Sequence, residues 1–211
     1  MKTKKLLFYL LSVFLGGCVL SLQPLYTEKD LIFEEKLLGT WAKNDSKETW
    51  QFKRANGDKQ YKMIYTDENG KKGPFDAGLG KLNNMMFLNI FPQEPKLKEN
   101  DFYKFHILRV HSFIKIEQIE PILKMRIMNP DKAKEMLEND PNPIKHEIVQ
   151  DRLILTASTK ELQEFMKAHA NDEGLFGEPS ELKRVEAKDT NDPNAIEPNR
   201  PEPKSIEADK N

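Results

Sequence analysis

Hydrophobic and polar positions alternate through much of the first half of the chain. Tyr61, Met63 and Tyr65 alternate with Lys62, Ile64 and Thr66, which is the two-residue period of a β-strand. Asn56-Gly57 and Asn69-Gly70 flank this stretch, and both pairs favour tight hairpin turns because their residues tolerate positive φ. The pattern predicts an antiparallel meander with strands over residues 38–42, 48–53, 61–66, 75–80 and 85–91.

Two glycines, Gly78 and Gly80, fall inside the fourth strand of this meander. Glycine in a strand often marks a bulge or a sharp bend, as barrel closure requires. We therefore expect an irregularity there.

The second half of the chain mixes strands with two short helices. Residues 106–119 and 122–128 have the composition of strands, and residues 144–149 and 152–156 give a weaker signal for a further pair. Asn129-Pro130 predicts a helix start, since asparagine caps helices and proline favours the first helical position.

A second helix is predicted from residue 159 to about 170. Ser158 and Glu161 have the spacing of a capping box, and the helix has one apolar face. The fold class is therefore mainly β, an antiparallel meander or barrel of about seven to nine strands with two short α-helices.

The N-terminus has the layout of a secretory signal. Three lysines among the first five residues precede the apolar run Leu6–Leu15, and Gly16, Gly17 and Cys18 follow. The segment Leu15-Gly16-Gly17-Cys18 resembles the lipobox of bacterial lipoproteins. The resemblance implies cleavage before Cys18, thioether attachment of a diacylglycerol to its sulfur, and acylation of the new amine with a fatty acid such as palmitate.

Two alternatives to lipidation remain, an ordinary cleaved signal peptide and an uncleaved anchor ending near Leu22, which would be short for a bilayer span. Position 19 is Val rather than Asp, which by resemblance to the sorting rule of enteric bacteria favours the outer over the inner membrane. We thus expect a cell-envelope protein whose membrane contact is its lipid anchor.

Charge and cysteine content argue against two features, a nucleic-acid partner and a disulfide. The chain of 211 residues has a net charge of −1, and removal of residues 1–17 would change it to −4, so no nucleic-acid partner is expected. Its single cysteine excludes an intramolecular disulfide. The predicted organisation is a signal peptide (1–17), a lipidated N-terminal segment (18–36), a β domain (37–185) and a disordered, proline-rich tail (186–211).

Gly39-Thr40-Trp41 resembles the Gly-x-Trp signature of lipocalins, in which the tryptophan plugs the closed end of an up-and-down barrel. Residues 19–181 are similar to an uncharacterised family of bacterial lipocalin-like lipoproteins. This similarity rests on Ser21-Leu22-Gln23-Pro24-Leu25-Tyr26, Leu38-Gly39-Thr40-Trp41, Thr49-Trp50 and Leu155-Thr156-Ala157-Ser158-Thr159. It implies fold and location but no chemistry. Arg152 is the candidate for the arginine that packs across the tryptophan in lipocalins.

Candidate chemical groups are few. His106 and His111 would lie on opposite faces of one strand, and His146 and His169 lie in other elements, so no metal site is expected. Ser112 and Ser158 are the candidate nucleophiles, but capping explains Ser158. We expect neither a catalytic residue nor a cofactor beyond the covalent diacylglycerol and N-acyl group at Cys18.

The aromatic residues of the meander allow a filled barrel interior or an open ligand cavity. Trp41, Trp50 and Phe52 are the residues expected to line any such pocket. The expected function is a non-enzymatic binding or structural module of the envelope, with an apolar small molecule or an envelope protein as partner. The alternative is an envelope hydrolase acting on lipid or cell-wall material.

Overall fold

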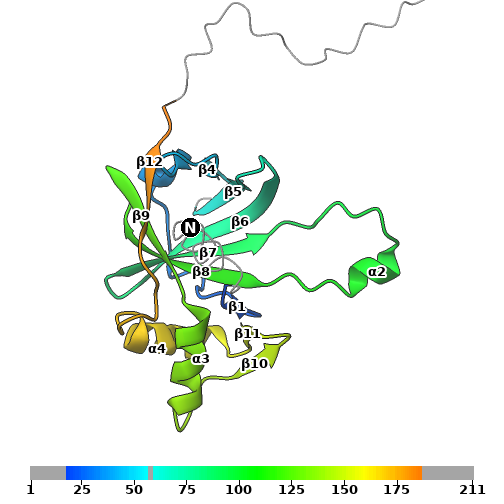
Figure 1. The fold of residues 1–211 in the computed structure, drawn as a ribbon, viewed down its shortest axis with the longest axis vertical. Coiled ribbons are helices and arrows are strands. Elements are labelled where there is room, and N and C mark those ends of the chain that lie inside the picture. The colour runs from blue at the N-terminus through cyan, green and yellow to red at the C-terminus, as the bar shows by residue number, and fades with distance from the viewer. Residues whose placement is uncertain (1–17, 57–58, 187–211) are drawn as a thin grey trace, which may run out of the picture.

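A computed structural model describes residues 18–56 and 59–186 of the chain. The predicted signal peptide, and all of the predicted tail except Glu186, lie outside these residues. The dominant feature is a closed, eight-stranded antiparallel barrel (Figure 1). Around the barrel its strands are β3 (Gly39–Ala42), β4 (Thr49–Arg54), β5 (Gln60–Thr66), β6 (Lys72–Leu82), β7 (Met85–Pro92), β8 (His111–Gln118), β9 (Ile122–Ile127) and β12 (Ser180–Arg184).

The barrel closes because β12 pairs with β9 on one side and with β3 on the other. The predicted fold class, a mainly β lipocalin-like barrel, is therefore confirmed, and the five-strand meander corresponds to β3–β7. The last barrel strand is β12, however, and not the weakly predicted pair at 144–156. That pair forms a hairpin, β10 (His146–Val149) and β11 (Arg152–Leu155), which lies outside the barrel.

One end of the barrel is crossed by a short 3₁₀ helix, η1 (Glu35–Leu37), which directly precedes β3. Side chains from the ends of two barrel strands hold η1 in place. Arg54 at the end of β4 donates to Glu35, and Arg184 at the end of β12 donates to the Lys36 and Leu38 carbonyls. These contacts fix η1 across the barrel opening, so this is the closed end.

Trp41 lies inside that closed end and is fully buried. Its indole Nε1 donates to the Leu37 carbonyl at 2.9 Å, and the Arg184 guanidinium stacks over the ring, 4.3 Å from its centroid. The arginine that packs across the tryptophan is thus Arg184. The assignment of Arg152 was wrong, because Arg152 begins β11, outside the barrel.

Gly39 makes this stacking sterically feasible. Its φ is +116°, a conformation that side-chain-bearing residues rarely adopt. A Cβ at this position would lie 2.7 Å from Nη1 of Arg184. Glycine at the start of β3 therefore permits both the backbone turn and the approach of the arginine.

The glycines of β6 serve the N-terminal segment rather than a bulge. Pairing of β6 with β7 is continuous from Phe75 to Leu82, and the other edge of β6 pairs with β5 up to Gly78 and with β2 (Leu31–Ile32) at Leu79 and Gly80, so the register shows no bulge there. A Cβ on Gly78 would lie 2.6 Å from the Tyr26 ring and 2.9 Å from Leu31. The two glycines leave space for the chain that crosses the outside of the barrel.

This N-terminal segment contributes two short strands. β1 (Leu20–Ser21) pairs with the first two residues of β8 and, in parallel, with β11, while β2 (Leu31–Ile32) pairs with β6. Of the three helices, the second and third lie beside β1, β10 and β11 on the outer face of the barrel, and the first lies at the far end of an extended loop (Figure 1). The helices are α2 (Asp101–Phe105), α3 (Pro130–Asn139) and α4 (Thr159–His169).

The helix predictions from the caps were correct for α3 and α4. Asn129 accepts from the Asp131 and Lys132 amides, and the capping box of Ser158 and Glu161 is fully formed. The predicted strand over 106–119 was too long, since residues 106–110 belong to a loop that follows α2. Among the described residues, none of the helices has the length and apolar character needed to cross a bilayer.

Two apolar clusters result from this arrangement. The barrel interior contains Leu37, Trp41, Phe52, Tyr61, Met63, Ala77, Leu79, Leu88, Ile114, Ile116, Ile119, Leu123, Met125 and Leu182. The outer cluster lies between the barrel wall, the N-terminal segment, β11, α3, α4 and the loop after α4, and includes Leu25, Phe87, Phe113, Leu153, Leu162 and Phe176. Large side chains fill the barrel, as in one of the two arrangements that the sequence allowed.

Candidate functional site

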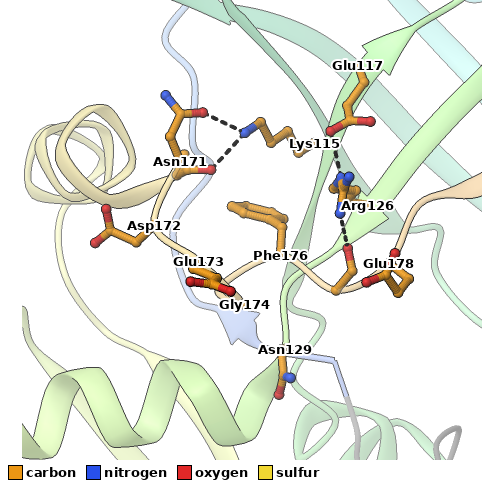
Figure 2. A pocket seen from close by; sticks show the side chains of 12 residues that line it. Lys115, Glu117, Arg126, Asn129, Asn171, Asp172, Glu173, Gly174, Phe176 and Glu178 are labelled. Atoms are coloured by element: carbon orange, nitrogen blue, oxygen red, sulfur yellow. Dashed lines mark hydrogen bonds and ion pairs between the residues drawn. The ribbon is translucent and has the colours of Figure 1, made fainter.

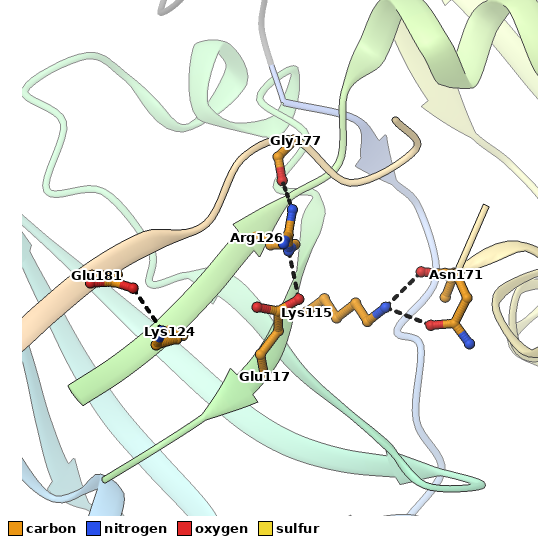
Figure 3. A network of polar contacts seen from close by, with 8 residues as sticks. Lys115, Glu117, Lys124, Arg126, Asn171, Gly177 and Glu181 are labelled. Atoms are coloured by element: carbon orange, nitrogen blue, oxygen red, sulfur yellow. Dashed lines mark hydrogen bonds and ion pairs between the residues drawn. The ribbon is translucent and has the colours of Figure 1, made fainter. Parts of the chain in front are cut away.

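Two cations stand opposite each other on the outer face of the barrel. Lys115 of β8 and Arg126 of β9 are direct cross-strand partners. Like charges in this relation destabilise a sheet unless each finds its own partners. Here they do, because the side chains turn toward different parts of the loop that joins α4 to β12 (Figure 3).

Lys115 reaches the end of α4. Its Nζ donates to the Ala170 carbonyl at 2.7 Å and to Oδ1 of Asn171 at 2.8 Å, and it lies 5.7 Å from the centroid of the Phe176 ring. The pKa of Lys115 is lowered from its usual range, chiefly by burial, with Glu117 acting against the shift and Arg126 adding to it. Because Nζ bonds the Ala170 carbonyl at the end of α4, the ammonium group acts as a positive cap on the carbonyl end of the helix.

Arg126 holds the other end of the same loop. Its Nε donates to Glu117 at 2.6 Å, and its Nη1 donates to the Gly177 carbonyl at 2.8 Å. Two residues earlier on β9, Lys124 pairs with Glu181 of β12 at 2.7 Å (Figure 3). The loop from 170 to 178 is thus fixed to the barrel wall at both of its ends.

A polar crevice of about 600 Å³ opens between this loop and strands β8 and β9 (Figure 2). Phe176 forms an apolar part of its wall, and side-chain amides come from Asn129 and Asn171. The charged lining is mixed, with the carboxylates of Glu117, Asp172, Glu173 and Glu178 and the cations of Lys115 and Arg126. Both cations already bond to the protein, so the crevice offers chiefly carboxylate acceptors beside an aromatic ring, which suits a small donor-rich or cationic group.

The three residues expected to line a ligand pocket lie elsewhere. Trp41 and Phe52 are buried inside the barrel, and neither contributes to the crevice. Trp50 is half-buried near the end of the barrel at which β4 begins, with its ring 5.2 Å from that of Tyr65. Trp50 is therefore the member of the predicted set nearest to solvent.

The four histidines have separate local partners. His106 bonds the Phe102 carbonyl, His111 bonds Asn89, His146 bonds the Ile144 carbonyl, and His169 bonds Asp172. In the described part of the chain, no hydrogen bond joins a histidine to a serine. Nor do three or more His, Cys, Asp or Glu side chains gather there in a way that could hold a metal ion.

His111 is half-buried, between Asn89 and the Phe91 ring. Asn89 accepts from the Leu25 amide through Oδ1, so its Nδ2 must face Nδ1 of His111, at 3.0 Å. Nδ1 is then the acceptor, and the ring proton lies on Nε2. Burial lowers the pKa of His111, so the neutral ring is the form that this site favours.

Sequence reasoning missed Lys115 and Arg126. Both are ordinary outward-facing residues of their strands, and their roles depend on a loop about 50 residues further along the chain. The one available signal was that their spacing around the β8–β9 turn makes them cross-strand neighbours.

Comparison with known proteins adds no relative. The chain matches no family model, no curated protein and no solved structure.

Proposed function

We propose that the protein is a lipid-anchored lipoprotein of the bacterial cell envelope, attached to the membrane through Cys18. The observation that carries this proposal is the position of the chain's only cysteine. It follows an apolar, lysine-led segment in the sequence, is exposed, and directly precedes the first residues that pack on the barrel.

The transition from anchor to folded body is abrupt. Val19 is buried in the outer cluster, and Leu20 already pairs with Ser112 and Ile154. A diacylglycerol on Cys18 would therefore connect to the sheet without a spacer. One acyl chain holds a protein only marginally and two or three hold it firmly, so the diacylglycerol and N-acyl group together would keep the barrel at the membrane surface.

For the body we propose a non-enzymatic binding or structural role. The filled barrel interior supports contact through the outer surface over carriage of a molecule inside. An envelope protein that presents donor groups to the polar crevice is one fitting partner. An apolar small molecule would have to bind near Trp50, where the barrel wall is half-exposed. The valine after Cys18 favours the outer membrane as the location.

The anchor is tested by Cys18→Ala in the source bacterium. Because the thiol is exposed, we expect this variant to fold, to lose labelling by radioactive palmitate, and to leave the membrane fraction. Gln23→Ala is the matched control, since Gln23 is also exposed in the same segment, and it should keep both label and location. Persistent labelling of Cys18→Ala, or a wild-type protein with an unmodified thiol, would contradict the proposal.

A further inference from the structure

The connection between β7 and β8 extends away from the barrel and carries α2 at its far end (Figure 1). Large apolar side chains are concentrated there with unusual exposure. Phe102 is 77% exposed, Phe105 85% and Leu108 71%, with Tyr103 and Ile107 also exposed. We call residues 101–108 the apolar tip. Soluble surfaces seldom gather so many exposed apolar side chains in one place, and such a group marks an interaction site.

The apolar tip is a preformed structure. Asn100 caps α2 by accepting from the Tyr103 amide at 2.9 Å, and Lys104 pairs with Asp101 at 3.2 Å. The rings of Phe102 and Phe105 both contact His106, with centroid separations of 4.7 and 5.7 Å. Since α2 buries none of its residues, this local order holds the rings outward instead of packing them on the barrel.

The base of the loop is also fixed. Arg109 donates to the Pro92 carbonyl at 3.3 Å, and its guanidinium lies over the Phe91 ring. Phe91 in turn stacks on His111, with 4.4 Å between ring centroids. The two ends of the loop are thereby joined next to the barrel.

We propose that the apolar tip inserts into the interfacial region of a lipid bilayer. Its composition fits that region, where aromatic rings with polar edges and basic side chains are favoured. Tyr103 and His106 supply such edges. The loop carries four basic residues that can meet anionic lipid headgroups, Lys96, Lys98, Lys104 and Arg109, against three acidic ones, Glu94, Glu99 and Asp101, so its net charge is +1.

A second copy of the chain fits the apolar tip less well. Large side chains bury roughly 150–250 Å² each, so these five residues, at 41–85% exposure, offer roughly 600 Å². A stable protein interface buries about 800 Å² per partner and needs a complementary shape. A protruding tip satisfies neither requirement, whereas a bilayer needs no matching surface.

The location of the lipid anchor also supports a bilayer as the partner of the apolar tip. To this extent the inference rests on the proposed function. β1 begins two residues after Cys18 and pairs with His111 and Ser112, the residues at which the loop rejoins the barrel. The attachment point of the lipid and the base of the loop therefore belong to adjacent strands. Lipid chains and apolar tip together would give the protein two points of contact with one membrane.

The test uses the lipidated protein purified from its host and reconstituted into vesicles of phosphatidylethanolamine and phosphatidylglycerol. Phe105→Trp places a fluorescent reporter in the apolar tip, and brominated acyl chains quench tryptophans that reach the bilayer. We expect the added fluorescence to fall by about half or more, as for a side chain at the boundary between headgroups and acyl chains. Wild type supplies the background from Trp41 and Trp50, and Val185→Trp, at another exposed apolar position, should not be quenched.

Palmitate labelling of the same preparations separates this inference from the proposed function. A labelled protein whose tip reporter is unquenched overturns the insertion and leaves the anchor intact. An unlabelled protein whose tip reporter is quenched supports the insertion and overturns the anchor. Emission from the tip reporter that is blue-shifted without lipid and insensitive to bromine would mean that a protein or a second copy covers the tip, and would overturn the insertion.

Discussion

The barrel interior and the outer cluster bury similar apolar side chains, but they are assembled from different kinds of chain segment. Most of the interior comes from consecutive hairpins, where every second residue points inward. The outer cluster combines the N-terminal segment, the outer face of β7 and β8, two helices and the loop after α4. The interior can therefore form largely from sequence neighbours, whereas the outer cluster depends on segments far apart in the chain.

The largest effect should come from emptying the closed end of the barrel. Trp41→Ala removes a fully buried ring, its bond to Leu37 and the surface on which Arg184 stacks. We expect a loss of about 3–5 kcal/mol in the free energy of unfolding, measured by urea denaturation with circular dichroism. Trp50→Ala, at a half-buried site, is the control and should cost less. A loss below about 1 kcal/mol for Trp41→Ala would mean that the interior tolerates an empty closed end.

A smaller and more local loss is expected in the outer cluster. Leu162 is fully buried on α4, and Leu162→Ala should cost about 2–3 kcal/mol. Because the barrel closes without α4, amide hydrogen exchange should accelerate in α3 and α4 before it does so in β4 and β5. Equal acceleration in both regions would show that interior and outer cluster unfold as one unit.

Arg184→Met tests the polar part of the closed end. The substitution removes hydrogen bonds to two backbone carbonyls and the contact with Trp41, and should cost about 1–2 kcal/mol. Arg152→Met is the matched control, because Arg152 is exposed at the start of β11, and its effect should stay within about 0.5 kcal/mol. The free energy of unfolding of both variants is measured by chemical denaturation. Equal losses of stability in the two variants would contradict the role given to Arg184.

The smallest effect is a pH dependence located in the outer layer. The pKa of His111 is lowered in the folded state, so the unfolded chain binds more protons as the pH falls below about 6.5. Folding stability should therefore decrease from pH 7 toward pH 5. His111→Gln removes the titrating ring and should flatten this part of the profile, measured as urea midpoints against pH. An unchanged profile would place the dependence on other groups.

The sequence predicted the elements whose signals are local. Alternation and the Asn-Gly turns identified β3–β7, and the caps at Asn129 and Ser158 identified α3 and α4. β12 was missed because only Leu182 is a buried apolar residue among five. The segment forms a strand because β9 and β3 each have an unpaired edge in the rest of the barrel, and β12 pairs with both.

Predictions that depend on contacts between distant segments failed for the same reason. Arg152 was chosen for Trp41 because the sequence cannot show which distant strand lies beside β3, and Arg184 holds that place through the register of β12. Ile107, Leu108 and Val110 suggested a strand because they are apolar. Apolar character does not reveal whether a partner strand exists, and here these residues belong to the protruding loop.

Under the proposed export to the cell envelope, the parallel pairing of β1 with β11 determines which contact of the N-terminal segment forms last. A chain that leaves the translocation channel from its N-terminus presents Leu20 long before Ile154, its partner, emerges. The residues next to the proposed tether consequently stay unpaired on that side while most of the molecule is being delivered. Lipidation and cleavage at Cys18 would then act on an extended, accessible segment. Leu20 and Ser21 would pair with β11 only afterwards, when Cys18 is already attached to the membrane.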